Sequence, residues 1–141
     1  MAGRVAAVAQ EEVDVVLEQF AAVNERDFER AMELYADDVE LFVHQRAFLE
    51  GGTLRGREAV GEWFGNWFRA FGRDYRFDID EARDLGDAVL VVARHRGRGR
   101  TSGAEVHGET AYLYRVRDGR VVRAELYGSR AEALEASGGR E

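Results

Sequence analysis

The segment from Trp63 to Phe71 reads W-F-G-N-W-F-R-A-F and carries five aromatic side chains. At roughly 100° per residue, the five rings fall within an arc of roughly 140° on one side of an α-helix. Such a wide aromatic face needs a broad apolar surface to pack against, and we expect most of these rings in the core. Trp63 and Trp67 also carry N–H groups that need polar partners. One or both are therefore candidates for lining a cavity between this helix and a sheet.

Length and composition indicate one folded domain. The chain has 141 residues, of which 45% are hydrophobic, so it can bury a single core and is not a disordered tail. No apolar stretch approaches the roughly 20 residues of a membrane-spanning helix, so we expect no membrane partner. The apolar run within residues 1–10 is too short for a secretory signal, and cysteine is absent. Both features favour a cytoplasmic location.

The charged residues exclude several function classes. All 20 basic residues are arginine, so Schiff-base chemistry on lysine is excluded. The net charge of −7 disfavours a nucleic-acid partner. The three histidines are isolated in the sequence, without the spacing of a metal site, so we expect neither a metal nor a cofactor.

The first half of the chain predicts three helices. Apolar residues at helical spacing predict a helix over 8–24. Asp27 is a candidate N-cap for a second helix that extends through Tyr35. A short alternating strand over 39–43 and a glycine-punctuated loop over 44–57 come next, and the aromatic helix follows.

The second half predicts an antiparallel meander. From about residue 75 apolar residues recur with period two, and the strands are expected over 75–80, 88–101, 104–117 and 120–127. Helices followed by a run of strands are typical of an α+β domain.

Two short hairpin signals set the expected register, namely Ser102-Gly103 and Asp118-Gly119. With two-residue turns, Arg96 faces Glu109, and one sheet face carries a ladder of opposite charges beside an apolar patch that includes Leu126. This outer face predicts a homodimer interface.

The opposite sheet face is mostly apolar and should receive the helices, but His95, Tyr112, Arg123 and Glu125 interrupt it. Polar groups on a core-facing surface must pair or line a cavity. His95 can act as a general acid or base, oriented by Glu125 or Tyr112, or it can be a hydrogen-bonded structural histidine. Arg123 and Glu125 can equally form a plain ion pair.

Further candidates surround the expected cavity. The phenols of Tyr112 and Tyr35 can donate to a ligand oxygen or be satisfied core hydroxyls. His44 is expected at the pocket mouth, as a second proton carrier or as an exposed side chain. The predicted ligand-binding residues are Tyr35, Phe20, Trp63, Trp67, Phe48, Arg123 and Tyr127.

Several segments together resemble a known group: Leu34–Val39, Gly51–Val60, Leu85–Val92, Gly97–Gly103 and Tyr114–Tyr127. Their order and spacing are similar to the SnoaL-like branch of the nuclear transport factor 2-like superfamily, which also contains ketosteroid isomerase.

The resemblance implies a single SnoaL-like domain over 1–141, with its core over about 8–136. It also implies a cystatin-like cone, in which three N-terminal helices pack in a strongly curved antiparallel sheet around an apolar pocket, usually as a homodimer. The catalytic residues of relatives do not carry over. Where the isomerase has its Asp base this chain has Val43 and His44, its oxyanion-donating Asp corresponds approximately to Tyr112, and an Asp common after the final strand is Ser129.

Two functions follow from these observations. One is a protein that binds a small, largely apolar molecule. The other is a cofactor-independent acid–base enzyme, such as an isomerase, polyketide cyclase or dehydratase, acting on a carbonyl-bearing or polycyclic substrate. A dimerisation module with a filled cone is a third reading. The lack of an inward-facing Asp base favours binding.

Overall fold

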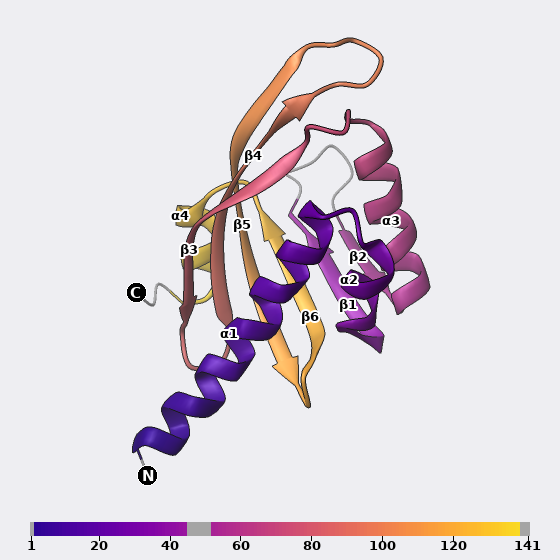
Figure 1. The fold of residues 1–141 in the computed structure, drawn as a ribbon. Helices are drawn as coiled ribbons and strands as arrows, with labels where there is room; N and C mark the ends of the chain where they lie inside the picture. Colours follow the sequence, from indigo (N-terminus) through magenta and orange to yellow (C-terminus); the bar gives the residue numbers. More distant parts are fainter. Residues whose placement is uncertain (1, 45–51, 139–141) are drawn as a thin grey trace.

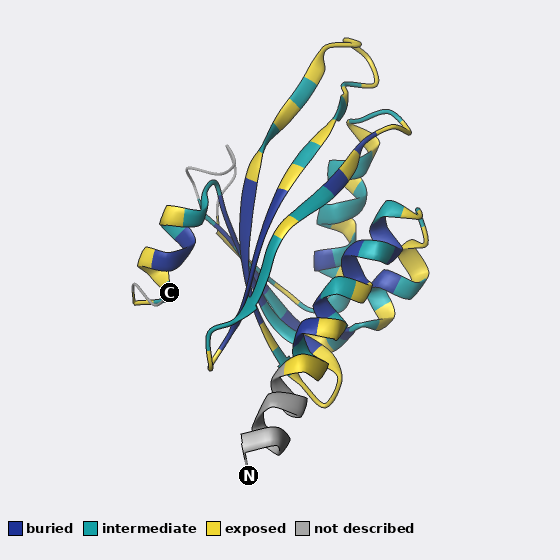
Figure 2. Cartoon of the chain, turned by 60° about the vertical axis from the view of Figure 1, so that its left-hand side comes forward, coloured by how far each residue is buried: buried dark blue, intermediate teal, exposed yellow. Residues whose placement is uncertain are grey.

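The computed structural model describes residues 2–44 and 52–138, with side chains from Gln10 onward. One curled six-stranded sheet, in the order β2-β1-β6-β5-β4-β3, forms the centre of the molecule. Helices α1, α2 and α3 pack on one side of it and a fourth helix, α4, on the other (Figures 1 and 2). The predicted α+β cone is confirmed.

The three N-terminal helices are α1 (Ala2–Asn24), α2 (Phe28–Glu33) and α3 (Arg57–Arg69). Asp27 caps α2 as predicted, because its side chain accepts a hydrogen bond from the backbone N–H of Arg30 at 3.2 Å.

The second helix is shorter than predicted, because Tyr35 begins strand β1 (Tyr35–Val43). Tyr35 pairs with Val121 of the last strand, and the N–H of Val121 donates to the carbonyl of Leu34 at 2.7 Å. Strand pairing across the fold outweighs helical spacing here.

The sheet is mixed rather than wholly antiparallel, since β1 runs parallel to β6. Strand β2 lies in the predicted loop and pairs antiparallel with β1, placing Leu54 opposite Leu41. The remaining bounds are β2 (Gly52–Arg55), β3 (Arg76–Asp84), β4 (Val89–Arg98), β5 (Glu105–Arg117) and β6 (Arg120–Tyr127).

The hairpin between β4 and β5 has a longer loop than predicted. Arg98 pairs with Glu105, and Arg96 faces His107 instead of Glu109. The N–H of Gly99 closes this loop onto the carbonyl of Ala104 at 2.9 Å. Because the register differs by two residues, every side chain keeps its predicted face.

The hairpin between β5 and β6 contains a β-bulge that the sequence did not reveal. Arg115 pairs with Arg123, whereas Val116 pairs with Val121, so Val122 is an extra residue. A shift of one residue moves all later side chains of a strand to the opposite face.

The bulge overturns part of the predicted site. Glu125, Arg123 and Tyr127 point to the outer face rather than inward, while Ala124 and Leu126 point to the helices. The prediction that Leu126 belongs to an outer apolar patch was wrong, since it belongs to the inner core and is 2% exposed.

Two apolar cores sandwich the sheet. The inner core joins α1–α3 to the concave face. The outer core lies under α4 (Arg130–Ala136), which Ser129 caps by accepting from the N–H of Glu132 at 3.2 Å. It consists of Ala88, Leu90, Val92, Ala111, Leu113, Tyr127, Ala133 and Leu134. Helix α4 thus covers part of the face predicted to dimerise, and the homodimer stays a prediction. None of the described helices is long and apolar enough to cross a membrane.

Candidate functional site

A pocket of about 620 Å³ lies between the three helices of the concave side. Its walls are mostly apolar and include Val23 of α1, Phe28 and Met32 of α2, and Phe64 and Phe68 of α3. This volume is in the range that binds small organic molecules. This pocket lies among the helices, whereas the sequence predicted a cavity between the aromatic helix and the sheet; that cavity stays a prediction.

Two buried polar side chains reach this pocket, Gln19 of α1 and Tyr35 of β1. They are 4% and 1% exposed, and neither the side-chain oxygen of Gln19 nor the hydroxyl of Tyr35 has a hydrogen-bond partner among the described residues. Buried polar atoms are nearly always paired, so this pair needs an explanation.

The fold holds Tyr35 firmly in place. Its ring stacks on Phe64 with centroids 6.3 Å apart, and the guanidinium of Arg57 donates two hydrogen bonds to its backbone carbonyl, at 2.8 and 3.1 Å. Burial raises the pKa of Tyr35 well above its ordinary value, so the hydroxyl keeps its proton and can donate it to a ligand.

Arg26 ties the end of α1 to the segment after α3. It adopts a positive φ of 65°, and its guanidinium donates to the carbonyls of Val23 at 3.2 Å, Arg73 at 3.1 Å and Tyr75. It also lies over the ring of Phe68 at 5.6 Å. These contacts fix one side of the pocket mouth.

A second polar cluster lies inside the cone, centred on Tyr75. The indole N–H of Trp67 donates to the Tyr75 hydroxyl at 3.0 Å, and this hydroxyl lies 2.8 Å from Nδ1 of His95. The indole can only donate to the hydroxyl, and we assign the tyrosine proton to the bond with Nδ1, which leaves the proton of the neutral imidazole on Nε2. Burial, with a smaller contribution from His107, lowers the pKa of His95 and favours this neutral form.

The other predicted inner residues are core residues with satisfied contacts. The hydroxyl of Tyr112 accepts from Thr110 at 3.2 Å. Phe20 packs edge-on against Tyr112, with centroids 5.2 Å apart, and also against Phe77 and Tyr114.

Some aromatic residues of α3 contact the polar cluster around Tyr75, and others line the helix-side pocket. Trp63 stacks on Trp67 at 5.8 Å, and Trp67 gives its N–H to Tyr75. The wall of the helix-side pocket instead uses Phe64, Phe68 and, beyond the helix, Phe71. The indole N–H that the sequence suggested for a cavity has a protein partner.

Three predicted site residues lie on the outer face, whereas His95 lies on the inner face of the sheet. Arg123 contacts Glu125 at 2.9 Å and Glu40 at 3.0 Å, and the hydroxyl of Tyr127 donates to Glu125 at 2.8 Å. The arginine and glutamate therefore form an ion pair, which was the simpler alternative.

His44 lies 3.2 Å from Glu132 of α4 and does not line the helix-side pocket. Phe48 lies outside the described residues. Sequence reasoning also missed Gln19 and Tyr75. Gln19 was detectable as a polar residue within an apolar helical stripe, between Val16 and Phe20.

Residues 16–124 match the model of the SnoaL-like domain family. No functionally curated protein matches the chain.

Several solved structures share the fold. TerC, co-crystallised with polyporic acid, is 21% identical, with a TM-score of 0.71 over 89% of this chain and 96% of that chain. A protein named as a SnoaL-like polyketide cyclase from Jannaschia sp. CCS1 is 20% identical, with a TM-score of 0.74 over 90% and 91%. RV0760c from Mycobacterium tuberculosis, in complex with estradiol-17beta-hemisuccinate, is 20% identical, with a TM-score of 0.71 over 86% and 95%.

At these identities the structural neighbours establish the fold, and the family match rests on the sequence itself. Because the match spans more than half of the chain and the curled sheet with its three helices agrees with it, the chain belongs to the SnoaL-like domain family.

Proposed function

We propose that this protein binds a small, largely apolar molecule in the helix-side pocket, with polar groups of the ligand paired to Gln19 and Tyr35. The observation that carries the proposal is the pair of buried, unpartnered oxygens at an apolar pocket of about 620 Å³. A ligand donor can pair with the Gln19 oxygen, and a ligand acceptor can pair with the Tyr35 hydroxyl.

The energetics support a ligand-binding role. Each buried polar group without a partner destabilises the protein by about 1–3 kcal/mol. A ligand that forms hydrogen bonds with both oxygens removes this cost, and the difference contributes to its binding free energy. Similar folds hold small molecules: TerC was crystallised with polyporic acid, and RV0760c with estradiol-17beta-hemisuccinate. The Jannaschia protein carries the name of a polyketide cyclase, so a catalytic role is the second candidate function considered below.

The fluorescent probe N-phenyl-naphthylamine (NPN) tests the pocket. Gly65 lines it, and a Cβ placed there would meet only the mobile end of Arg69, at 3.3 Å. Gly65→Leu should therefore fill the pocket without disturbing the helix, and lower NPN affinity about tenfold or more. Gly65→Ala is the matched control and should bind NPN within about twofold of the wild type.

A lack of NPN binding by the wild-type protein, or equal binding by the Gly65→Leu variant, would exclude the pocket as the ligand site. Circular dichroism of the three proteins verifies that the fold is retained.

The hydrogen bond from Tyr75 to His95 favours a second candidate function, acid–base catalysis in the cone. In the assigned tautomer the neutral imidazole carries its proton on Nε2, which can polarise a carbonyl oxygen. Exchange of the α-protons of β-tetralone in heavy water, followed by NMR, tests this role. His95→Gln should slow any catalysed exchange about 100-fold, and equal rates would remove His95 from the reaction.

A further inference from the structure

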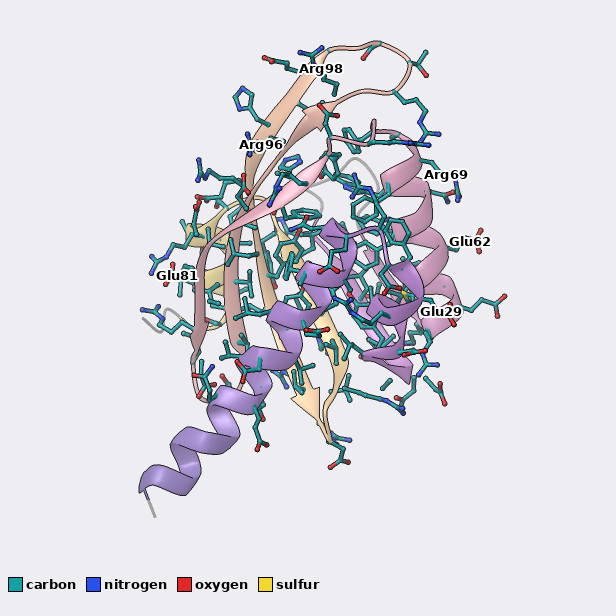
Figure 3. The ribbon with its side chains drawn as sticks, viewed as in Figure 1. Glu29, Glu62, Arg69, Glu81, Arg96 and Arg98 are labelled. Atoms are coloured by element: carbon teal, nitrogen blue, oxygen red, sulfur yellow. The ribbon has the colours of Figure 1, made fainter. Side chains whose placement is uncertain are left out.

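Four arginines from separate parts of the chain surround the mouth of the helix-side pocket. Arg26 follows α1, Arg69 ends α3, Arg73 precedes β3 and Arg100 belongs to the β4–β5 loop. Figure 3 shows Arg69 at the end of α3, with Glu62 further back along the same helix. None of the described residues that line the pocket is acidic, although the chain has a net charge of −7.

These four guanidinium groups have no carboxylate partner among the described residues. Arg26 donates to backbone carbonyls, and Arg69 donates to the side-chain oxygen of Asn66. Many arginines elsewhere are paired, as Arg94 is with Asp80 at 3.0 Å and Arg96 is with Asp78 at 2.9 Å. The other arginines with a described side chain but without an ion pair to a described residue are Arg98, Arg115, Arg117 and Arg120, and none of these lines the pocket. The mouth therefore carries uncompensated positive charge beside apolar walls.

A carboxylate close to the mouth belongs to Asp74, because Gly72 lines the pocket. Its Oδ1 lies 3.2 Å from the point where a Cβ on Gly72 would stand. Asp74 lines a separate hollow of the β3–β5 end together with Arg76, Arg96 and Arg98, so it has basic neighbours of its own. It does not line the helix-side pocket.

We infer that the pocket selects an anionic amphiphile: a molecule whose apolar body fills the space between the helices and whose carboxylate or sulfonate lies at the arginine mouth. The inference rests on the proposed binding function and adds the charge and the orientation of the ligand. Oriented in this way, the ligand presents its inner polar groups to Gln19 and Tyr35 and its acidic group to the guanidinium groups.

The physical basis is the contrast between the two ends of the pocket. Guanidinium groups bind carboxylates and sulfonates through charge-assisted, often bidentate hydrogen bonds, which lysine cannot reproduce with the same geometry. Apolar walls focus the field of these groups toward the opening and attract anions. The inner end offers only neutral partners, since burial keeps the Tyr35 hydroxyl protonated, so an anion placed there would lose its hydration without gaining a counter-charge.

Two fluorescent probes with the same apolar body test this inference: NPN is neutral, whereas anilinonaphthalene sulfonate (ANS) carries a sulfonate. The test variant combines Arg69→Gln, Arg73→Gln and Arg100→Gln, and leaves out Arg26 because of its structural hydrogen bonds. Arg115→Gln, Arg117→Gln and Arg120→Gln together form the matched control, because these arginines are exposed, lie outside the pocket and change the net charge equally.

We expect the wild-type protein to bind ANS more tightly than NPN, with an ANS affinity that falls as salt is added. At about threefold for each exposed arginine, the test variant should lose about 20-fold or more in ANS affinity. Its NPN affinity, and both affinities of the control variant, should change less than about twofold.

The results separate this inference from the proposed function. If NPN binds to the pocket but the test variant binds ANS as well as the wild type does, the pocket is a neutral site and the inference is wrong. If neither probe binds the wild-type protein, the proposed function fails as well. Equal losses of ANS affinity in the test and control variants would indicate an effect of net charge alone, and would also overturn the inference.

Discussion

Replacing Tyr35 by Phe should stabilise the ligand-free protein. The substitution removes a hydroxyl that is buried and has no hydrogen-bond partner, while the ring, its stacking on Phe64 and the backbone contacts to Arg57 remain. The desolvation cost of such a group is about 1–3 kcal/mol, and the variant recovers it. With an unfolding entropy of about 0.3 kcal/mol/K for a chain of this length, Tm should rise by roughly 3–10 °C.

The same chemical change at Tyr112 should have the opposite effect. Its hydroxyl accepts from Thr110 at 3.2 Å, so Tyr112→Phe removes a hydrogen bond and leaves the threonine hydroxyl without its acceptor. We expect a loss of about 1 kcal/mol and a Tm lower by about 3 °C. Differential scanning calorimetry of the two variants and the wild type measures both shifts.

Ligand binding provides an independent measurement on Tyr35→Phe. Naphthol and naphthalene differ by one hydroxyl, and competition with NPN reports the affinity of each. The wild-type protein should prefer naphthol about fivefold to tenfold, because its hydroxyl pairs with Tyr35, and the variant should lose most of this preference. A Tm equal to or below that of the wild type would refute the argument, because the Tyr35 hydroxyl would then have a partner in solution.

Three other predictions concern the cone interior and the sheet. Because the pKa of His95 is lowered in the folded protein, the unfolded chain binds more protons than the folded one once the pH falls below about 6.5. The free energy of unfolding should therefore decrease as the pH falls from there to the folded pKa of His95. Urea titrations between about pH 5 and 7 should show this decrease in the wild type and a smaller one in His95→Gln. Gly97→Ala places a Cβ 2.6 Å from the Cα of Tyr75, so it should cost about 3 kcal/mol or more and change the fluorescence of Trp67, whereas Gly103→Ala, with open space around it but a φ of 69°, should cost about 1 kcal/mol. Leu126→Asp buries a carboxylate at a position that is 2% exposed, so it should unfold the protein, as circular dichroism would detect. A variant that is folded and monomeric, beside a wild-type protein that is dimeric, would instead show that Leu126 belongs to a subunit interface.

The family and the fold class followed from the sequence because they depend on patterns spread over the whole chain. The period change near residue 75 separated helices from strands, and Asp27 marked a helix start through its own side chain. The assignment of His95 and Tyr112 to the concave face was correct although the predicted β4–β5 register differed from the observed one by two residues. A difference of two residues leaves each side chain on the same face of the sheet.

The sequence pattern could not locate features that depend on contacts between residues far apart in the chain. Tyr35 matches a helical stripe, but its pairing with Val121 places it in the sheet, and its position beside Gln19 exists only in the folded chain. Helix α4 is short, and its role becomes evident only where Leu134 contacts the outer core.

By itself the sequence determined which residues are apolar, where the period changes and which family the chain resembles, since each of these is a property of neighbours along the chain. The tertiary structure decided the rest. A single extra residue at Val122 turned Arg123, Glu125 and Tyr127 to the outer face, because side chains alternate along a strand and one inserted residue reverses them all. The packing of three helices placed Gln19, Tyr35 and four arginines, from separate parts of the chain, around one pocket, and no periodicity encodes that arrangement.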